Sequence, residues 1–413
     1  MINSCYQTIT KLLGIQDFIV KAIEEKEGQI WIYGEVEKPA SCPHCKGKES
    51  REYKGKEQRI RHQDIWGKKS YLVLWHPSYQ CTECGLFYTP QWSFAQYTPH
   101  YTDAFVKEIV RLAQGSSLVH VSWLLDEPYS NVERMYYDYL MKQDGPKRLR
   151  WQAKHIGFDE IAIRKGHGDF ILIVYDLDKG LVLDILPDRK QATLKNYLCS
   201  LPPETRASIQ SVCIDMWWPY RDCILKELPS ALIIIDRFHI AKELNKAIDK
   251  IRKQLLAQGQ FAQLSGEERK QLTWAVRYSP KMLRKKPKYK RVLKKAMKLS
   301  KPLRQVLALR SQFKQIFDRK RPQEVRPRIT EWLRQASRTK LAPILDFLKT
   351  FHNWRTWIMM FVPLRYTNAA AEGLNNKIKL IKRLGFGFES IVHFRLRILH
   401  TCGYLTLTLH PFW

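Results

Sequence analysis

Between residues 151 and 240 the apolar residues occur in short runs separated by turns, which is the pattern of β-strands. Five runs are expected as strands: 155–164, 170–178, 181–188, 211–218 and 231–239. Amphipathic segments at 192–202 and 219–229 are expected as helices between them. The order β-β-β-α-β-α-β joins an antiparallel meander to alternating elements. It favours an α/β fold with a mixed sheet flanked by helices.

From residue 241 to 360 the apolar residues recur at three- and four-residue steps instead, which predicts helices. The clearest stripe is Ile240, Leu244, Ala247, Ile248, Ile251 and Leu255. We therefore expect 241–360 to be an all-helical insertion. Two further helices are expected within 361–413, and they would complete the sheet domain. In the first of them Asn368 is the expected N-cap and Gly385 follows the last turn.

The N-terminal part divides into two expected regions. Residues 1–95 are expected to be strands and turns, including the alternating run SYLVLW. Residues 96–150 are expected to form three short helices at 102–115, 117–125 and 131–142, the last capped by Ser130, followed by a linker at 144–148. Three short helices with a tight turn before the last fit a helix-turn-helix whose third helix would read DNA. Any small helical bundle would show the same pattern.

Four of the nine cysteines form two close pairs, Cys42-Pro-His-Cys45 and Cys81-Thr-Glu-Cys84. Two such knuckles suggest one tetrahedral, structural zinc ion, because the two-residue spacer lets both thiolates point at one metal. Gly85 would permit the tight turn after the second pair. His44 is a possible substitute ligand, and the alternative is four unrelated buried thiols.

Charge is concentrated late in the chain, which carries 70 Lys and Arg against 40 Asp and Glu. Residues 1–236 hold 30 basic and 30 acidic residues, whereas 237–360 hold 33 basic and 8 acidic ones. A nucleic-acid partner is the simplest interpretation of such an excess, although a solvated helical face is the alternative. Candidate DNA contacts are Lys285, Lys286, Lys288, Lys290, Arg291, Lys379, Lys382 and Arg383.

Three carboxylates stand out within apolar or structured surroundings: Asp159 in the first strand, Asp215 in the fourth and Glu372 in the late helix. A carboxylate among apolar strand residues is costly unless it is paired or bound to metal. Converging, the three would hold two Mg²⁺ (or Mn²⁺) ions about 4 Å apart for phosphoryl transfer.

Each of these carboxylates also has a purely structural alternative. Asp159 could pair with a lysine, and Glu160 competes with it for the inward face of the strand. Asp215 could cap the following helix, and Glu372 could suit the positive end of its own helix. Asp236 is a fourth candidate. His239 is expected to pack or contact substrate rather than bind metal.

No run approaches the roughly 18 uninterrupted apolar residues of a membrane span. The N-terminal residues MINSCYQTITKLLG lack a basic lead followed by an apolar core, so no signal peptide is expected. Hydrophobic residues make up 45% of the chain, which is enough for packed cores. These features favour a cytoplasmic protein over a secreted or integral membrane protein, and disulfides are not expected.

The chain resembles the ISL-three family of bacterial insertion-sequence transposases. The motifs that carry the resemblance occur in the family's order: CPHC, CTEC, GFDE, CIDMWWPY, LIIIDRFHIAKELNKAIDKIR and TNAAAEGLNNKIKLIKRLGFGF. The resemblance implies an RNase H-like catalytic domain with a DDE triad on Asp159, Asp215 and Glu372, interrupted by a helical insertion. It further implies that a zinc ribbon and a helix-turn-helix recognise terminal inverted repeats. Such an enzyme cuts the element's ends and joins the freed 3′-OH to target double-stranded DNA.

Two other functions compete with an active transposase. A DNA-binding regulator could use the same ribbon and helices without catalysis, and an RNase H-like nuclease could cut without joining. An RNA-binding protein is a weaker third alternative, because no aromatic-rich RNA motif is present. Since transposition brings two DNA ends together, a homo-oligomer, a dimer or larger, is expected on DNA in the bacterial nucleoid.

Overall fold

The computed structural model describes residues 2–15, 17–38, 41–147, 149–163, 169–319, 321–367, 369–385, 387–388 and 390–406. The predicted N-cap Asn368 lies outside these residues. The chain divides into two compact units. The first unit comprises residues 1–147, 381–401 and 405–413, and the second comprises 148–380 and 402–404. Within the described residues no helix is both long and apolar enough to cross a membrane.

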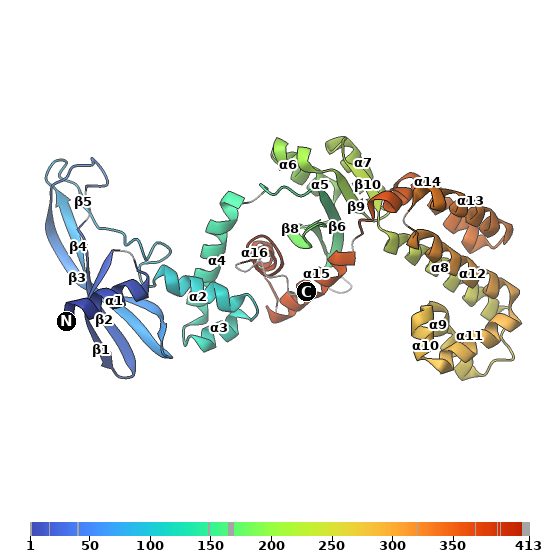
Figure 1. Cartoon of the computed structure of the whole chain (residues 1–413), viewed down its shortest axis with the longest axis horizontal. Helices are drawn as coiled ribbons and strands as arrows, with labels where there is room; N and C mark the ends of the chain where they lie inside the picture. The colour runs from blue at the N-terminus through green and yellow to red at the C-terminus, as the bar shows by residue number, and fades with distance from the viewer. Residues whose placement is uncertain are drawn as a thin grey trace. The chain divides into compact units, whose positions relative to one another are not determined.

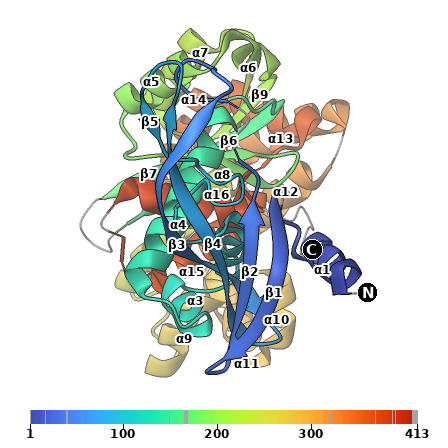
Figure 2. The same cartoon turned by 90° about the vertical axis from the view of Figure 1, so that its left-hand side faces the viewer.

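The first unit begins with helix α1 (Ile2–Leu13) and a twisted sheet. Its strands are β1 (Phe18–Lys26), β2 (Gln29–Val36), β3 (Ser50–Ile65), β4 (Lys68–Cys81) and the short β5 (Phe87–Tyr88). They pair in the order β1-β2-β4-β3, with β5 on β4, and the long β3–β4 hairpin is seen in Figure 2. The expectation of strands and turns alone is wrong for α1, which forms because Ile9 and Leu13, four residues apart, pack on the core of this sheet.

Three helices follow the sheet: α2 (Asp103–Ala113), α3 (Leu118–Leu124) and α4 (Tyr129–Lys147). Thr102 and Ser117 cap the first two through their side chains. The predicted boundaries of α4 are wrong at both ends, because it starts at Tyr129 rather than after Ser130 and continues into the expected linker as far as Lys147. The buried Asp144 explains the extension: it pairs with Arg395 at 2.7 Å, a contact from α16 (Ile391–Cys402) that periodicity cannot reveal.

The second unit contains the predicted α/β sheet. Its elements are β6 (His155–Ala162), β7 (Phe170–Asp176), β8 (Leu181–Leu186), α5 (Gln191–Ser200), α6 (Pro203–Ser208), β9 (Ser211–Ile214), α7 (Trp218–Glu227) and β10 (Leu232–Ile235). The strand order is β10-β9-β6-β7-β8. β7 pairs antiparallel with both β6 and β8, whereas β9 and β10 run parallel to β6. The mixed α/β fold expected from the sequence is therefore confirmed.

All five predicted strands end earlier than expected, the first three by two residues and the last two by four. The fourth stops at Ile214, and Trp218 already belongs to α7. The fifth stops at Ile235, because Asp236 caps α8 (Arg237–Ala257) and so converts Arg237-Phe238-His239 into the first turn of a helix. Aspartate is a preferred N-cap, so this boundary follows from side-chain chemistry that the apolar pattern does not report.

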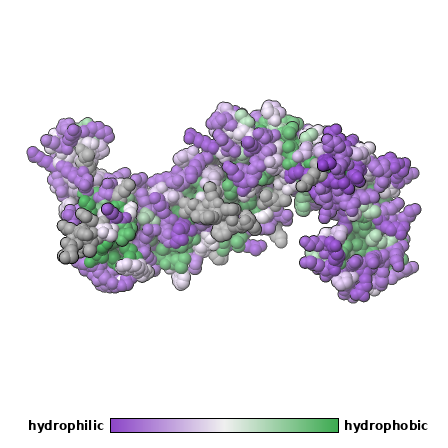
Figure 3. Space-filling model, in the orientation of Figure 1, coloured by the Kyte–Doolittle hydropathy of each residue, from purple (hydrophilic) through white to green (hydrophobic). Residues whose placement is uncertain are grey.

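The expected helical insertion is present as α8 to α14. After α8 it comprises α9 (Gly266–Arg277), α10 (Pro280–Lys285), α11 (Pro287–Leu299), α12 (Lys301–Asp318), α13 (Pro322–Arg338) and α14 (Ala342–Leu364). Helices α8, α12, α13 and α14 pack side by side, and α14 also contacts β10 (Figure 1). One continuous apolar core runs from the sheet into these helices. The outer surface of these helices is mostly hydrophilic (Figure 3). Helix α15 (Ala369–Leu384) follows α14 in the chain.

Candidate functional site

Strand register brings the predicted aspartates to one level of the sheet. In the parallel pair β6–β9, Gly157 lies opposite Cys213. Asp159 and Asp215 each follow two residues later, so they stand side by side beyond the paired segment. Asp236 comes directly after β10, the parallel neighbour of β9. Ligand-binding sites commonly form where parallel strands end in this way.

Asp159 is held by two hydrogen bonds. Asn375 of α15 donates from Nδ2 to Asp159 Oδ2 at 2.7 Å, and the Glu160 amide donates to Oδ1 at 2.8 Å. The hydroxyl of Tyr175, a buried residue of β7, donates in turn to Asn375 Oδ1. Burial and the charge of Asp215 nevertheless raise the pKa of Asp159, and they outweigh these hydrogen bonds. A cation between the two carboxylates would relieve that repulsion.

His239 approaches the second aspartate from the first turn of α8. Its Nε2 lies 2.8 Å from Asp215 Oδ1, an oxygen that is buried from solvent. Burial by itself lowers the pKa of His239, but the hydrogen bond to Asp215 and the nearby charges of Asp215, Asp236 and Asp159 outweigh it and raise that pKa. Atoms of Asp159, Asp215 and His239 suited to metal binding all lie within 4.8 Å of one another. The sequence predicted that His239 packs or contacts substrate, and it did not predict that the imidazole lies beside these two carboxylates.

The neighbouring carboxylates Asp236 and Glu160 have partners of their own. Asp236 accepts a hydrogen bond of 3.2 Å from the Phe238 amide and so starts α8. Burial raises its pKa. Glu160 lies 3.0 Å from Arg189 and accepts a 3.2 Å bond from the Tyr220 hydroxyl, so its charge is compensated there.

The structural alternative for Asp215 was that it caps the following helix, α7. Trp217, not Asp215, occupies the N-cap of α7, and no side chain caps that helix.

Glu372 lies in the first turn of α15 and is exposed. It lines the same cavity as Asp159 and Asp215, which has a volume of about 980 Å³. It does not belong to the close group of potential ligand atoms formed by Asp159, Asp215 and His239. Asn375, one helical turn later, is the α15 residue that reaches Asp159. Glu372 and Asn375 are three residues apart, so on a helix they share one face. This spacing was the sequence signal that could have identified Asn375 as a site residue.

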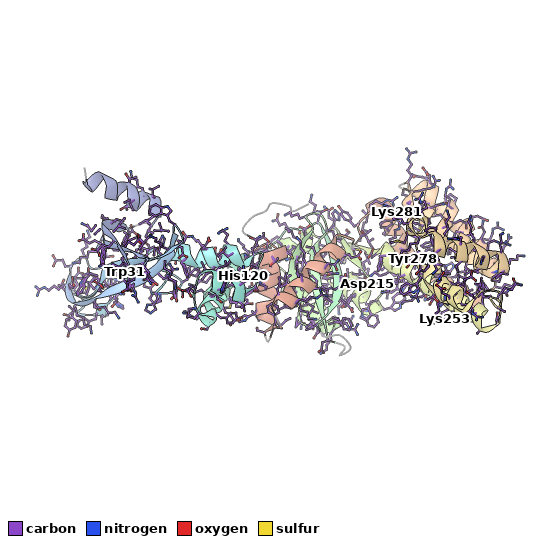
Figure 4. The ribbon with its side chains drawn as sticks, turned by 90° about the horizontal axis from the view of Figure 1, so that it is seen from below. Trp31, His120, Asp215, Lys253, Tyr278 and Lys281 are labelled. Carbon is purple, nitrogen blue, oxygen red and sulfur yellow. The ribbon has the colours of Figure 1, made fainter. Side chains whose placement is uncertain are left out.

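The cavity extends from the sheet into the insertion. Figure 4 shows Asp215 at the sheet and Tyr278 among the helices of the same unit, and both line the cavity. Exposed cations stand on its wall: Lys242, Arg277, Lys314 and Lys379. Leu283, Leu293 and Phe313 add apolar surface. The cavity therefore combines carboxylates, cations and apolar side chains.

The predicted DNA contacts occupy different settings. Lys285, Lys290 and Arg291 are exposed on α10 and α11. Lys288 pairs with Glu267 at 2.6 Å, and the Lys286 ammonium lies 4.9 Å from the Tyr278 ring centre. On α15, Lys379 lines the cavity, and Lys382 and Arg383 occupy the last turn.

The four predicted zinc ligands come together in the first unit. Metal-binding atoms of Cys42, Cys45, Cys81 and Cys84 lie within 4.8 Å of one another. The sulfurs of Cys42 and Cys84 are 3.9 Å apart, and those of Cys45 and Cys81 are 3.5 Å apart. Tetrahedral zinc with Zn–S bonds of about 2.3 Å separates its ligand sulfurs by about 3.8 Å. The geometry therefore fits one zinc ion.

Both knuckles use the same backbone turn. The Lys46 amide donates to the Cys42 carbonyl and the Gly85 amide to the Cys81 carbonyl, each at 3.0 Å. Lys46 and Gly85 have φ of 66° and 71°, so the expected role of Gly85 in a tight turn is confirmed.

The pKa values of two of these thiols depart from the usual value in opposite directions. Backbone amides, that of Cys84 first, lower the pKa of Cys81 to about 7. At Cys45 the Gly47 amide acts in the same direction, but burial and the other sulfurs prevail and raise the pKa to about 12. Four thiolates this close ionise together only when a metal neutralises them.

The sequence is similar to known transposases over both units of the chain. A family model described as a transposase, DDE_Tnp_ISL3, matches residues 156–398. A second model, the zinc-finger of transposase IS204/IS1001/IS1096/IS1165, matches residues 38–84. The transposase for insertion sequence element IS1001 of Bordetella parapertussis is 24% identical over 359 residues, covering 86% of this chain and 87% of that protein. The transposase for IS1557 of Mycobacterium tuberculosis is 23% identical over 322 residues, covering 72% of this chain and 71% of that protein.

Proposed function

The chain belongs to the ISL-three (ISL3) family of DDE transposases, and from this premise we propose that it cuts the ends of a bacterial insertion sequence and joins them to target DNA. The observation that carries the proposal is the pair Asp159 and Asp215, which stand together just beyond the paired segment of the parallel strands β6 and β9, in a cavity whose wall also carries exposed cations. Half-buried carboxylates beside one another are costly unless a cation compensates them.

The donor set fits a hard divalent cation. Mg²⁺, or Mn²⁺ in its place, prefers carboxylate oxygens, and Asp159 and Asp215 supply them. We propose that these two residues, with Glu372 from the cavity wall, hold two such ions. When bound, the ions stabilise the attacking and leaving oxygens of phosphodiester cleavage and strand transfer. His239 offers a nitrogen beside the same carboxylates.

The protein's own side chains prepare the site. Asn375 fixes the rotamer of Asp159, and Tyr175 fixes that of Asn375, so the first carboxylate is oriented before substrate arrives. His239 holds Asp215 in the same way through its 2.8 Å contact. Lys242 and Lys379 on the cavity wall would attract the phosphates of the scissile strand.

We further propose that the first unit recognises the terminal inverted repeats. The zinc ribbon and the helices α2, α3 and α4 would supply a DNA-binding surface, with α4 as the reading helix of a helix-turn-helix. The basic residues of α10, α11 and α15 named above would bind the phosphate backbone. Transposition joins two ends, so a homo-oligomer on the DNA of the nucleoid follows from the mechanism.

The experiment uses DNA carrying the element's own ends, taken from the flanks of the gene. The protein and its Asp215→Asn variant are each incubated with this DNA and Mg²⁺, and the products are resolved by size. Nicked and joined products from the parent alone support the proposal. Cleavage without joining favours an RNase H-like nuclease, and binding without chemistry in either protein favours a regulator.

A further inference from the structure

Phe238 lies between Asp236 and His239 in the sequence, and it has no role in the proposed chemistry. It is the second residue of α8, directly after Arg237 in the Asp-Arg-Phe-His segment. Its side chain is 59% exposed, yet it lines the same cavity as Asp159 and Asp215. Single exposed apolar residues are ordinary on protein surfaces. The location of this one calls for an explanation.

The backbone of Phe238 is anchored on both sides. Its amide donates to the Asp236 carboxylate at 3.2 Å, which is the N-cap bond of α8. The next residue, His239, is held 2.8 Å from Asp215. The Phe238 and His239 rings meet edge to face, with centres 5.5 Å apart and planes at 78°. The exposed ring is therefore presented from a rigid position beside the carboxylates.

Folding does not explain a phenylalanine at this position. The apolar stripe that buries α8 begins at Ile240, and Phe238 is not among its buried residues. Alanine is the better helix former at an exposed position. An aromatic residue here gains little from packing, and its exposed ring is open to a molecule that enters the cavity.

The surroundings of the ring fit one class of occupant. Lys242 lies one turn further along α8, and Lys314 and Lys379 face the cavity from α12 and α15. A flat aromatic face beside cations and metal-binding carboxylates suits a nucleotide, which has a stacking base and an anionic phosphate. A volume of about 980 Å³ exceeds what metal ions alone require.

We propose that Phe238 stacks on an unpaired nucleobase at the DNA end and thereby holds the adjoining phosphate at Asp159 and Asp215. This inference rests on the proposed transposase function and names the form of the substrate at its site, a locally unpaired end. An enzyme that reacts inside a duplex gains access by unstacking the nucleotide, and an aromatic platform compensates part of that cost. Removing one such platform lowers affinity by about 5- to 150-fold.

The test is a double-mutant cycle in which one change is made in the protein and the other in the DNA. Affinities of the full chain for a labelled end duplex are measured by fluorescence anisotropy without added Mg²⁺ or Mn²⁺, so that no cleavage occurs. A single abasic nucleotide is placed at successive positions across the element–flank junction. Phe238→Ala is expected to weaken binding to the intact end about tenfold. At one or two junction positions the abasic duplex should bind parent and variant within about twofold, because neither can stack.

Three further variants separate stacking from general effects. Phe238→Trp should restore tight binding, whereas Phe238→Leu, apolar but not planar, should not. Phe87→Ala removes a phenylalanine of similar exposure, 52%, on β5. Any loss from Phe87→Ala should be the same on intact and abasic ends. Thermal unfolding of Phe238→Ala should match the parent, because the ring is exposed.

The outcomes distinguish the two proposals. If Phe238→Ala and the abasic sites act additively at every position, or if Phe238→Leu binds like the parent, the stacking role is wrong while the transposase function stands. If the parent neither binds nor cleaves the ends with Mg²⁺, the proposed function fails and the stacking role fails with it. Coupling at the junction together with rescue by Trp supports the inference.

Discussion

Asn375 and Asp159 are joined by a 2.7 Å hydrogen bond across 216 residues of sequence. Asn375 lies on α15, three residues after Glu372, and Asp159 lies in the middle of β6. The bond therefore ties the helix that carries the third predicted carboxylate to the strand that carries the first. The Tyr175 hydroxyl on β7 extends the link to a third element.

Replacing Asn375 should impair the site without unfolding the protein. Asn375→Ala frees the Asp159 carboxylate to rotate, and comparable losses beside metal ligands cost about 10- to 100-fold in activity or metal affinity. We expect a lower rate of end cleavage and a higher Mg²⁺ concentration for half-maximal rate, both measured on the element's ends. The neighbouring, exposed Asn376→Ala is the matched control. Equal behaviour of the two variants would contradict a positioning role for Asn375.

Asp236 should matter for stability through its N-cap bond. Asp236→Asn retains an oxygen acceptor and should change the free energy of unfolding by less than about 0.5 kcal/mol, whereas Asp236→Ala should cost about 1 kcal/mol. Urea unfolding of the three proteins measures the difference. A stable Asp236→Asn protein that no longer cleaves DNA would show instead that Asp236 takes part in the chemistry.

Zinc should be present at one ion per chain and should hold the ribbon together. Elemental analysis of protein purified without chelator checks the stoichiometry. Cys81→Ser removes a ligand, and loss of a structural zinc costs about 10 kcal/mol or more in isolated zinc peptides, so the ribbon should unfold and end binding should fall. Cys199→Ser, at an exposed thiol outside the cluster, is the control and should retain zinc. Full zinc content in Cys81→Ser would exclude this cluster as the site.

Stability should fall on acidification because of His62. Burial and the charge of Arg61 lower the pKa of His62 from 6.5 to about 4 in the folded protein. Its Nδ1 lies 2.9 Å from the hydroxyl oxygen of Thr102, the residue that caps α2. Between pH 6.5 and 4 the unfolded chain therefore binds more protons than the folded one. The stability due to this group is complete above pH 6.5 and is lost as the pH falls towards 4, by up to about 3 kcal/mol.

The His62 prediction is checked by urea unfolding at pH 7.5 and pH 5. His62→Gln, which does not titrate, should lose less stability between the two values than the parent. Zinc release on acidification affects both proteins, so the difference between them isolates His62. Parallel pH profiles would contradict the assignment.

DNA binding should weaken steeply with salt, and the insertion should contribute to that slope. Replacing both exposed residues Lys290 and Arg291 by alanine should reduce the slope of log affinity against log salt by about 2, if each contacts one phosphate. Anisotropy titrations between about 50 and 200 mM salt measure it. Lys288→Ala should change the slope less, because Lys288 already pairs with Glu267. A flat salt dependence would exclude the insertion as a DNA surface.

Local pattern was sufficient to locate the strands of the second unit, although it missed α1 and α6. Runs of apolar residues located β6 to β10, and a three- and four-residue stripe located the buried face of α8. The C-x-x-C spacing located the four thiols that now lie within 4.8 Å of one another. These features succeed because each depends on neighbours a few residues apart, whose geometry is set by strand or helix periodicity. Boundaries failed where a side chain decided them, as at the Asp236 cap.

The sequence by itself determined the fold class, the zinc ligands and the aspartates Asp159 and Asp215 as candidates. Only the tertiary structure decided that His239 lies against Asp215, that Asn375 holds Asp159, and that Glu372 remains on the cavity wall. It also decided that α16 packs on α4 through Arg395 and Asp144. Each of these contacts joins different elements, and two of them, Asn375 with Asp159 and Arg395 with Asp144, join elements more than 200 residues apart. Such contacts depend on strand order, register and core packing, which no local pattern encodes.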